Sequence, residues 1–336
     1  MNAWRLLNLG LVAGCSLSCR TALPPAAPRE TVALARVAEP PAAPSLPASS
    51  SANSFKLKVA EHWLLNPPGG ERFDASALLL RPEGNLYTVN DKSAGLYRID
   101  RRTNGTADLL RDPKWFTPGQ LTPISTGKIG RWDLEGLAQD ADGRIYFCEE
   151  LNRWVLRADP QTGRLERLDI DWSPVKKWFS KDVNASWEGI AVGTNDRLYL
   201  ANERSIGRII VVDLKSLRVV DDFQVAPLGH ASRDFMYSDL CWHADSLWVL
   251  CRQSRRVVQV DPASHRVLAD FDYTDIELST EFGYGVMLPY GQFEGLAVDA
   301  TNIWLVIDNN GTSRVLHPED RRPTLFRCPR PDRPSR

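Results

Sequence analysis

The stretch Trp132 to Glu150, W-D-L-E-G-L-A-Q-D-A-D-G-R-I-Y-F-C-E-E, decides the fold of this chain. Two short apolar runs flank a turn rich in Asp and Gly, which is the pattern of two antiparallel strands joined by a tight connection. A carboxylate stands before the first run, at Glu135, and another after the second run, at Glu150. Because the start of the first strand and the end of the second lie at one end of such a pair, we expect the two carboxylates to meet there.

The same pattern returns at intervals of 50 to 59 residues along the chain. Each repeat begins with one apolar run, and a second run rich in aromatic and aliphatic residues follows it. A third run often ends in Asp, and a turn then leads into a fourth run. Intervals of this length are typical of propellers, solenoids and repeat arrays. The aligned starts are Ser76-Ala77-Leu78, Glu135-Gly136-Leu137, Glu188-Gly189-Ile190, Ser238-Asp239-Leu240 and Glu294-Gly295-Leu296.

Four short strands in each unit predict an all-β protein, a β-propeller of four-stranded antiparallel blades. Radial closure would protect the strand edges that such sheets otherwise expose. We favour five blades, and a sixth could lie in the long connections 112–131 or 274–292. The last unit has little chain after its third run, so we expect residues 55–65 to supply its outer strand and to close the ring.

The first 15 residues resemble a secretory signal peptide. Arg5 precedes an apolar run at 6–13, which is too short to span a bilayer. The run ends in Val12-Ala13-Gly14-Cys15, which resembles a bacterial lipobox, so we predict that Cys15 carries a lipid. The alternatives are an unprocessed signal or cleavage by another peptidase. Ser16, rather than Asp, follows the cysteine, and we therefore expect an outer-membrane anchor that faces the periplasm or the exterior.

The remaining chain divides into a tether, a globular part and a tail. Residues 16–53 include seven prolines among Ala and Ser and few large apolar residues, so they cannot bury enough surface to offset their ordering entropy. We predict a semi-extended tether there, a β-propeller at 54–328 and a disordered tail at 329–336. The globular part would then meet the membrane only through the lipid anchor.

Composition and motifs exclude several classes of function. The formal net charge of -1 and the scattered basic residues provide no stripe for nucleic acid. The sequence has no G-x-S-x-G, no H-E-x-x-H, no phosphate-binding glycine loop and no dinucleotide fingerprint. We expect the partner to be a small molecule or a protein of the cell envelope. The cysteines of the globular part lack metal-site spacing, and we expect buried free thiols at Cys148, Cys241, Cys251 and Cys328.

Carboxylates at the strand ends predict a ring of oxygen ligands around one mouth of the central channel. A pair of carboxylates about 4 Å apart repels by about 4 kcal/mol at an effective dielectric near 20, so the ring needs a cation, an arginine or protons. No His or Cys recurs at these positions, and oxygen ligands alone suit calcium better than zinc. The predicted metal ligands are Glu135, Glu188, Glu294, Asp308 and Asp91.

Two alternatives to a metal ring remain open. In the fourth unit Arg252 stands where other units carry a carboxylate, and Asn202 and Arg204 flank the carboxylate of the third. These three residues could balance the ring within the protein, and they are our candidates for ligand binding. Alternatively, the Glu-Gly steps could accept backbone hydrogen bonds from the next blade, with glycine permitting close packing near the axis.

These observations predict a binding module with a calcium site at the acidic mouth. The alternative is a metal-dependent hydrolase of an ester, lactone or phosphoester, in which the cation activates the substrate or water and Glu203 or Glu150 moves the proton. His230, in the long connection before the fourth unit, could act as a general base. A third hypothesis, scaffolding through the propeller rim, does not require acids at the channel.

The repeated motifs resemble a known family. Gly84-Asn85-Leu86-Tyr87-Thr88-Val89-Asn90-Asp91, Asp133-Leu134-Glu135-Gly136-Leu137-Ala138 and Phe293-Glu294-Gly295-Leu296-Ala297 are similar to motifs of the bacterial SdiA-regulated propellers and of the related family named for the esterase-like activity of phytase. The likeness covers residues 55–326 and implies a secreted or envelope-anchored propeller that can bind calcium. The Glu-Gly starts also resemble calcium-dependent lactonases of the gluconolactonase type, but lack their Glu-Gly-Pro form.

Overall fold

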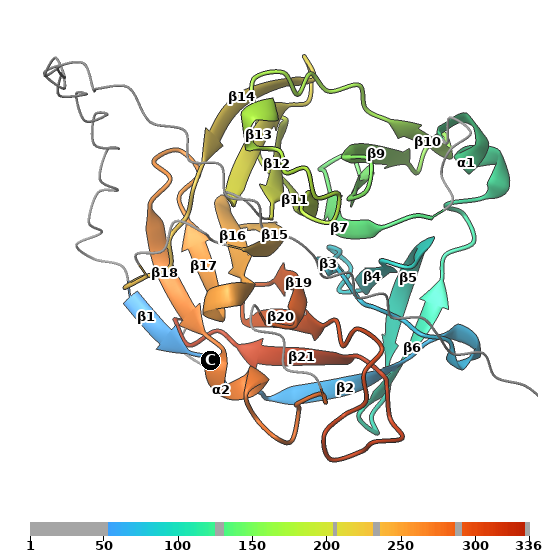
Figure 1. Ribbon diagram of the computed structural model, residues 1–336, viewed down its shortest axis with the longest axis vertical. Helices are drawn as coiled ribbons and strands as arrows, with labels where there is room; N and C mark the ends of the chain where they lie inside the picture. Colours follow the sequence, from blue (N-terminus) through green and yellow to red (C-terminus); the bar gives the residue numbers. More distant parts are fainter. Residues whose placement is uncertain (1–52, 125–130, 204–206, 231–235, 286–290, 333–336) are drawn as a thin grey trace, which may run out of the picture. The chain divides into compact units, whose positions relative to one another are not determined.

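The computed structural model describes residues 53–124, 131–203, 207–230, 236–285 and 291–332 (Figure 1). All of them belong to the second of the two compact units into which the chain divides, residues 48–336. The predicted signal peptide with Cys15, the tether up to residue 52, and Arg204 lie outside the described residues. None of the described helices is both long and apolar enough to cross a membrane.

The described chain is mostly β-structure and repeats a four-strand motif (Figure 1). The inner strands are β3 (Leu79–Leu80), β7 (Leu134–Gln139), β11 (Trp187–Val192), β15 (Tyr237–His243) and β19 (Phe293–Val298). The second strands are β4 (Leu86–Asn90), β8 (Ile145–Glu149), β12 (Arg197–Asn202), β16 (Ser246–Cys251) and β20 (Asn302–Ile307). The third strands are β5 (Ser93–Arg101), β9 (Trp154–Asp159), β13 (Arg208–Asp213), β17 (Arg256–Val260) and β21 (Thr324–Pro329). The outer strands are β6 (Thr106–Arg111), β10 (Arg164–Arg167), β14 (Arg218–Phe223), β18 (Val267–Asp272) and β2 (Glu61–Asn66).

A few short elements lie outside this motif. β1 (Asn53–Lys56) pairs in parallel with β18. The helical segments are α1 (Pro118–Ile124), α2 (Thr274–Glu277), η1 (Pro68–Gly70), η2 (Lys176–Trp178) and η3 (Arg252–Ser254).

The N-terminal strand β2 completes the last unit. It pairs antiparallel with β21 and parallel with β6, so it joins the last unit to the first in one sheet of order β19-β20-β21-β2-β6-β5-β4-β3. Figure 1 shows this meeting of the blue and red ends of the described chain. The prediction that the segment 55–65 supplies the missing outer strand is therefore confirmed for residues 61–65, whereas residues 55 and 56 lie in β1.

The inner strands surround a central channel. Each packs against the inner strand of the next unit, and β19 packs against β3. A Cβ atom on Gly189 would lie 2.6 Å from the Cα atom of Asp239, and one on Gly295 would lie 2.7 Å from the carbonyl carbon of Ala77. Both distances are too short for a real Cβ, so glycine permits this close approach, as the sequence suggested. The predicted all-β propeller of four-stranded antiparallel blades is confirmed.

Apolar cores lie between neighbouring units. One of them joins Trp248 and Phe271 of the fourth unit to Phe293 of the fifth. The rings of Trp248 and Phe271 lie 5.4 Å apart, and both side chains are fully buried. The cysteines of the described propeller are free, as expected, with Cys148, Cys251 and Cys328 buried and Cys241 partly buried.

The structure also bears on the alternative of a sixth blade and on the predicted disordered tail. The connections 112–131 and 274–292 contain α1 and α2, and the described part of neither contains a strand, so no sixth blade is seen there. At the C-terminus, the guanidinium of buried Arg330 lies 4.7 Å from the ring centre of Trp248 and pairs with Asp332 at 2.7 Å. Residues 329–332 therefore pack with the propeller, rather than starting a disordered tail.

Candidate metal centre

A β-bulge interrupts the first residues of β7, β11, β15 and β19. In each strand one residue has no partner in the second strand of its unit, which shifts the register. The extra residues are Glu135, Glu188, Ser238 and Glu294. A bulge bends the strand and re-aims a side chain. The three glutamates consequently line a common pocket at the strand starts.

One backbone hydrogen bond recurs at this end of all five units. The N–H of the first residue after the second strand donates to the carbonyl of a residue just before the inner strand, at 2.9 to 3.2 Å. The bond holds the end of one strand beside the start of the other, so the prediction that these ends meet is confirmed. The donor and acceptor pairs are Asp91 and Asp74, Glu150 and Asp133, Glu203 and Ser186, Arg252 and Met236, and Asp308 and Gln292.

A pocket of about 150 Å³ lies at this mouth of the channel and is lined mostly by polar and charged side chains. Each carboxylate in its lining belongs to a residue that exposes 8 % or less of its surface. The acidic lining residues are Asp91, Asp133, Glu135, Glu150, Glu188, Glu294 and Asp308. We refer to them, together with Asp74 and Glu203, as the acidic mouth. It contains all five predicted metal ligands.

Three groups of carboxylates in the acidic mouth are close enough to hold a cation. In each group one oxygen per residue lies within 4.8 Å of the others. Asp91 belongs to two of these groups, so it bridges the first unit to its neighbours on both sides. The groups are Asp74 with Asp91 and Asp308, Asp91 with Asp133 and Glu135, and Glu150 with Glu188 and Glu203.

Arg252 balances one side of the acidic mouth. Its buried guanidinium donates to Glu203 and to Glu294, whose side chains are also buried. Burial alone would lower the pKa of Arg252, but the charges of Glu203 and Glu188 raise it, so the guanidinium stays protonated. The structure thus places predicted metal ligand Glu294 with an arginine and outside the three cation-sized groups.

The carboxyls of Asp91 and Asp308 hold protons more strongly than ordinary aspartates. Burial, followed by the charge of Asp308, raises the pKa of Asp91 to about 7. Burial, followed by the charge of Asp74, raises the pKa of Asp308 to about 7. Both carboxyls would therefore be partly protonated at neutral pH without a cation. A bound divalent cation would displace these protons.

Two glutamates of the acidic mouth, Glu150 and Glu135, also have raised pKa values. Burial raises the pKa of Glu150 to about 8, with a further contribution from the charge of Glu203. Burial and the charge of Glu188 raise the pKa of Glu135 well above its ordinary value. Glu150 consequently carries a proton at neutral pH, which is the state that a general acid requires.

Basic side chains at the rim partly cover the carboxylates. Lys92 pairs with Asp91, and Arg131 pairs with Asp133 at 2.7 Å. The side chain of Arg131 is 53 % exposed and that of Lys92 is 34 % exposed. Each base is partly exposed although its carboxylate partner is buried, so a base that turns toward solvent would leave access to the pocket.

Two other predicted site residues lie outside the lining of this pocket. His230 is exposed, and two residues before it Leu228 donates to Asp270 of the outer strand β18 at 2.8 Å. His230 thus lies near Asp270 of an outer strand and is not among the residues that line the pocket. Asn202 is buried and serves as the last residue of β12, opposite Trp187 and Arg208.

Sequence reasoning missed two acids of the mouth and one of the channel. Asp74 and Asp133 stand two residues before the aligned starts, so an alignment extended by two positions would have found them. Asp239 stands where the second, third and fifth units carry glycine. Its buried carboxyl accepts the N–H groups of Leu240 at 2.8 Å and of Leu296 at 2.7 Å. Asp239 thus ties neighbouring inner strands together inside the channel.

The match to a family model covers this site. The model, described as Phytase-like, esterase-like activity of phytase, matches residues 74–311. This chain belongs to the Phytase-like family. The matched range begins at Asp74 and ends just after Asp308, so it contains every carboxylate of the acidic mouth. The resemblance inferred from the sequence motifs of this Phytase-like propeller is confirmed, and no curated protein matches the chain.

Solved structures are similar to this Phytase-like protein at low sequence identity. Glutaminyl cyclase from Myxococcus xanthus has a TM-score of 0.54 and 14 % identity, over 83 % of this chain and 97 % of that chain. Virginiamycin B lyase from Staphylococcus aureus has a TM-score of 0.39 and 12 % identity, over 76 % and 66 %. A protein of unknown function from Bacteroides caccae has a TM-score of 0.41 and 11 % identity, over 70 % and 71 %. The first likeness supports the propeller fold alone.

Proposed function

We propose that this protein is a binding module with one divalent cation, calcium, in its acidic mouth. The observation that carries the proposal is the position of Asp91. Its buried carboxylate belongs both to the group with Asp74 and Asp308 and to the group with Asp133 and Glu135. A single cation beside Asp91 would neutralise the most crowded part of the mouth.

The chemistry of the donors favours calcium over other common cations. The donors are carboxylates, and calcium takes six to eight oxygen ligands in flexible geometry, whereas magnesium demands a near-ideal octahedron. Zinc prefers nitrogen and sulfur ligands, and the three groups contain neither His nor Cys. The pocket of about 150 Å³ would also hold several waters, at about 30 Å³ each. These waters could complete the coordination.

Protein charges alone leave part of the mouth unbalanced. Arg252 pairs with Glu203 and Glu294, and neither of these carboxylates belongs to the two groups that contain Asp91. Near Asp91 the basic residues are Lys92, Arg72 and Arg131, which are partly exposed at the rim. Each of these bases pairs with a buried carboxylate, but the two groups that contain Asp91 hold five carboxylates against these three bases.

Thermal unfolding of the full chain tests the cation site. We expect calcium, added after treatment with a chelator, to raise the midpoint, with about 2.7 kcal/mol of added stability at a hundredfold excess over the dissociation constant. Magnesium should give a smaller rise. Asp91→Asn should abolish the calcium effect, whereas Asp275→Asn, at an exposed surface aspartate, should preserve it. An equal calcium response in Asp91→Asn would refute the site.

A second candidate function is metal-dependent ester hydrolysis at the same mouth. The group of Glu150, Glu188 and Glu203 favours it, because protonated Glu150 can donate to a leaving oxygen while Arg252 holds Glu203 in place. The cation would polarise the substrate oxygen. The family description, which names an esterase-like activity, agrees with this role.

Hydrolysis of nitrophenyl acetate, dihydrocoumarin and nitrophenyl phosphate distinguishes the two candidates. If the mouth is an active site, at least one substrate should be cleaved only with calcium, and Glu150→Gln should lower kcat by about a hundredfold or more. The calcium-induced rise in the unfolding midpoint should survive in that variant. If none of the three is cleaved, the binding module is the remaining function.

We also propose that Cys15 anchors the protein in the outer membrane, with its partner a small molecule or an envelope protein. The lipobox-like Val12-Ala13-Gly14-Cys15 and the proline-rich tether support this proposal. Mass spectrometry of the chain from a bacterial envelope should find a lipid on an N-terminal Cys15. A mature chain that begins elsewhere would contradict it.

A further inference from the structure

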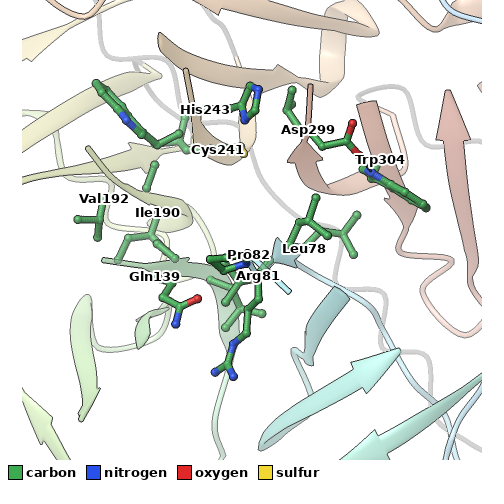
Figure 2. A pocket seen from close by; sticks show the side chains of 18 of the residues that line it. Leu78, Arg81, Pro82, Gln139, Ile190, Val192, Cys241, His243, Asp299 and Trp304 are labelled. Atoms are coloured by element: carbon green, nitrogen blue, oxygen red, sulfur yellow. Dashed lines mark hydrogen bonds between the residues drawn. The ribbon is translucent and has the colours of Figure 1, made fainter. Parts of the chain in front are cut away.

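A second cavity opens at the other mouth of the channel, where the inner strands end. It has a volume of about 610 Å³, which is within the range of small-molecule sites. We call it the distal pocket. Figure 2 shows Leu78, Ile190 and Cys241 from three different inner-strand segments around the same opening. Its apolar lining consists mainly of Leu78, Leu80, Ile190, Val192, Cys241 and Trp242.

The distal pocket is separate from the acidic mouth. Asp239 lies between them, and its Oδ2 accepts the N–H groups of Leu296 at 2.7 Å and of Leu78 at 3.4 Å. These bonds join inner strands of three units inside the channel. The two pockets share no lining residue. A ligand at one mouth therefore does not contact the other.

The carboxylates of the distal pocket already have partners. Asp140 accepts from the Nε of Arg144 at 2.6 Å and from the hydroxyl of Tyr146 at 3.0 Å. Asp299 accepts the indole N–H of Trp304 at 2.8 Å and the backbone N–H of Asn302 at 2.7 Å. Both side chains are thus occupied within their own turns, which lowers their capacity to attract a cation.

The arginines of the distal pocket lack such partners. Among the described residues, no carboxylate lies within ion-pair distance of Arg81 or Arg101, and the Nε of Arg81 is buried without a hydrogen-bond acceptor. The guanidinium of Arg81 lies 4.4 Å from the ring centre of Tyr87, and that of Arg101 lies 4.8 Å from that of Trp304. Stacking fixes their planes, and the edges of the guanidinium groups remain to donate hydrogen bonds.

We propose that the distal pocket binds a small amphipathic anion. The apolar body would fill the cavity beside Val192 and Trp242, and the anionic group would accept hydrogen bonds from Arg81 and Arg101. A carboxylate or a phosphate satisfies this requirement, because both match the fork of a guanidinium group. This site is independent of the proposed cation site.

Binding of anilinonaphthalene sulfonate to the full chain tests the proposal, because this dye joins an apolar body to an anion. We expect saturable binding of one dye per chain, with phenylnaphthylamine, which lacks the sulfonate, binding about tenfold more weakly. Arg81→Gln and Arg101→Gln should each weaken dye binding by about tenfold, as expected for loss of a charged hydrogen bond. Arg111→Gln, at the exposed last residue of strand β6, is the matched control and should leave the affinity unchanged.

Two filling variants, Val192→Trp and Leu80→Trp, should block the dye, and either one is informative if the other fails to fold. Asp91→Asn should retain dye binding, so failure of the cation site and failure of the distal pocket are distinguishable. The proposal is overturned if the dye does not saturate at one per chain, or if the two pocket arginine variants behave like Arg111→Gln. It is also overturned if the folded filling variants still bind the dye.

Discussion

The two mouths of the channel are made from the same inner strands, yet they have opposite chemistry. At the strand starts, bulges at Glu135, Glu188 and Glu294 bring carboxylates into one pocket. At the strand ends, side chains such as Ile190 and Val192 line a larger apolar pocket. A local change of register at one end of four inner strands therefore helps to give a single fold two different sites.

The two mouths also differ in their contribution to stability. Burial of apolar side chains near the distal pocket stabilises the fold. Burial of carboxylates at the acidic mouth opposes folding unless charges are paired or protons are taken up. Native domains are stable by only about 5 to 15 kcal/mol, so the acidic mouth is where a ligand should change stability most.

The largest expected effect comes from removing the positive charge of Arg252 from the acidic mouth. Arg252→Met leaves Glu203 and Glu294 buried without their partner, which should lower the free energy of unfolding by about 3 to 5 kcal/mol. Urea denaturation measures this loss. Arg164→Met, at an arginine whose side chain is 71 % exposed, should change stability by less than about 1 kcal/mol. A similar small loss in Arg252→Met would mean that the arginine is not needed there.

A second effect is a pH dependence confined to the acidic mouth. The raised pKa values of Asp91 and Asp308, about 7, and of Glu150, about 8, mean that the folded state keeps protons that the unfolded chain has released. The contribution of these groups to stability is therefore present at low pH and is lost as pH rises. With chelator present, the free energy of unfolding should fall between pH 5 and 8 by an amount on the order of a few kcal/mol.

Saturating calcium should flatten this pH dependence, because the cation replaces the protons. Arg81→Gln, in the distal pocket, should follow the wild-type profile in parallel. Urea denaturation at several pH values, with and without calcium, provides the comparison. A stability that rises with pH in chelator would contradict the role given to these buried acids.

The smallest expected effect concerns the rim. Lys92 pairs with Asp91 and competes with a cation for that carboxylate. Lys92→Gln should therefore tighten calcium binding by about two- to fivefold while changing the free energy of unfolding by less than about 1 kcal/mol. Lys215→Gln, whose lysine pairs with Asp196 at a distant and exposed site, should leave the calcium affinity unchanged. Weaker binding in Lys92→Gln would show that the lysine supports the site.

Much of this architecture follows from strand patterns in the sequence. The alternation in Trp132 to Glu150 and its repetition predict the units, and the short last unit predicts the strand that β2 supplies. The meeting of Glu150 with the start of its inner strand follows from antiparallel pairing alone. The repeating pattern of one sequence therefore predicts which consecutive strands pair and which strand ends meet.

The repeating pattern does not predict which side chains from different units contact one another. The pairing of Arg252 with Glu203 and Glu294 depends on which units are neighbours and on how far each bulge turns its side chain. The length of its connection predicts that His230 reaches the pocket, but His230 lies near Asp270 on an outer strand and outside the pocket lining. The distal pocket was missed because its residues are ordinary apolar and stacked side chains, whose significance depends on the empty space between them.

Calorimetric titration of calcium into the chelator-treated full chain tests the central claim most directly. The account predicts one calcium bound per chain, with release of protons at neutral pH as Asp91 and Asp308 ionise. Asp91→Asn should abolish this binding, and Arg101→Gln should preserve it. No calcium binding to the wild-type chain, or equal binding to Asp91→Asn, would contradict the claim that the acidic mouth is a cation site.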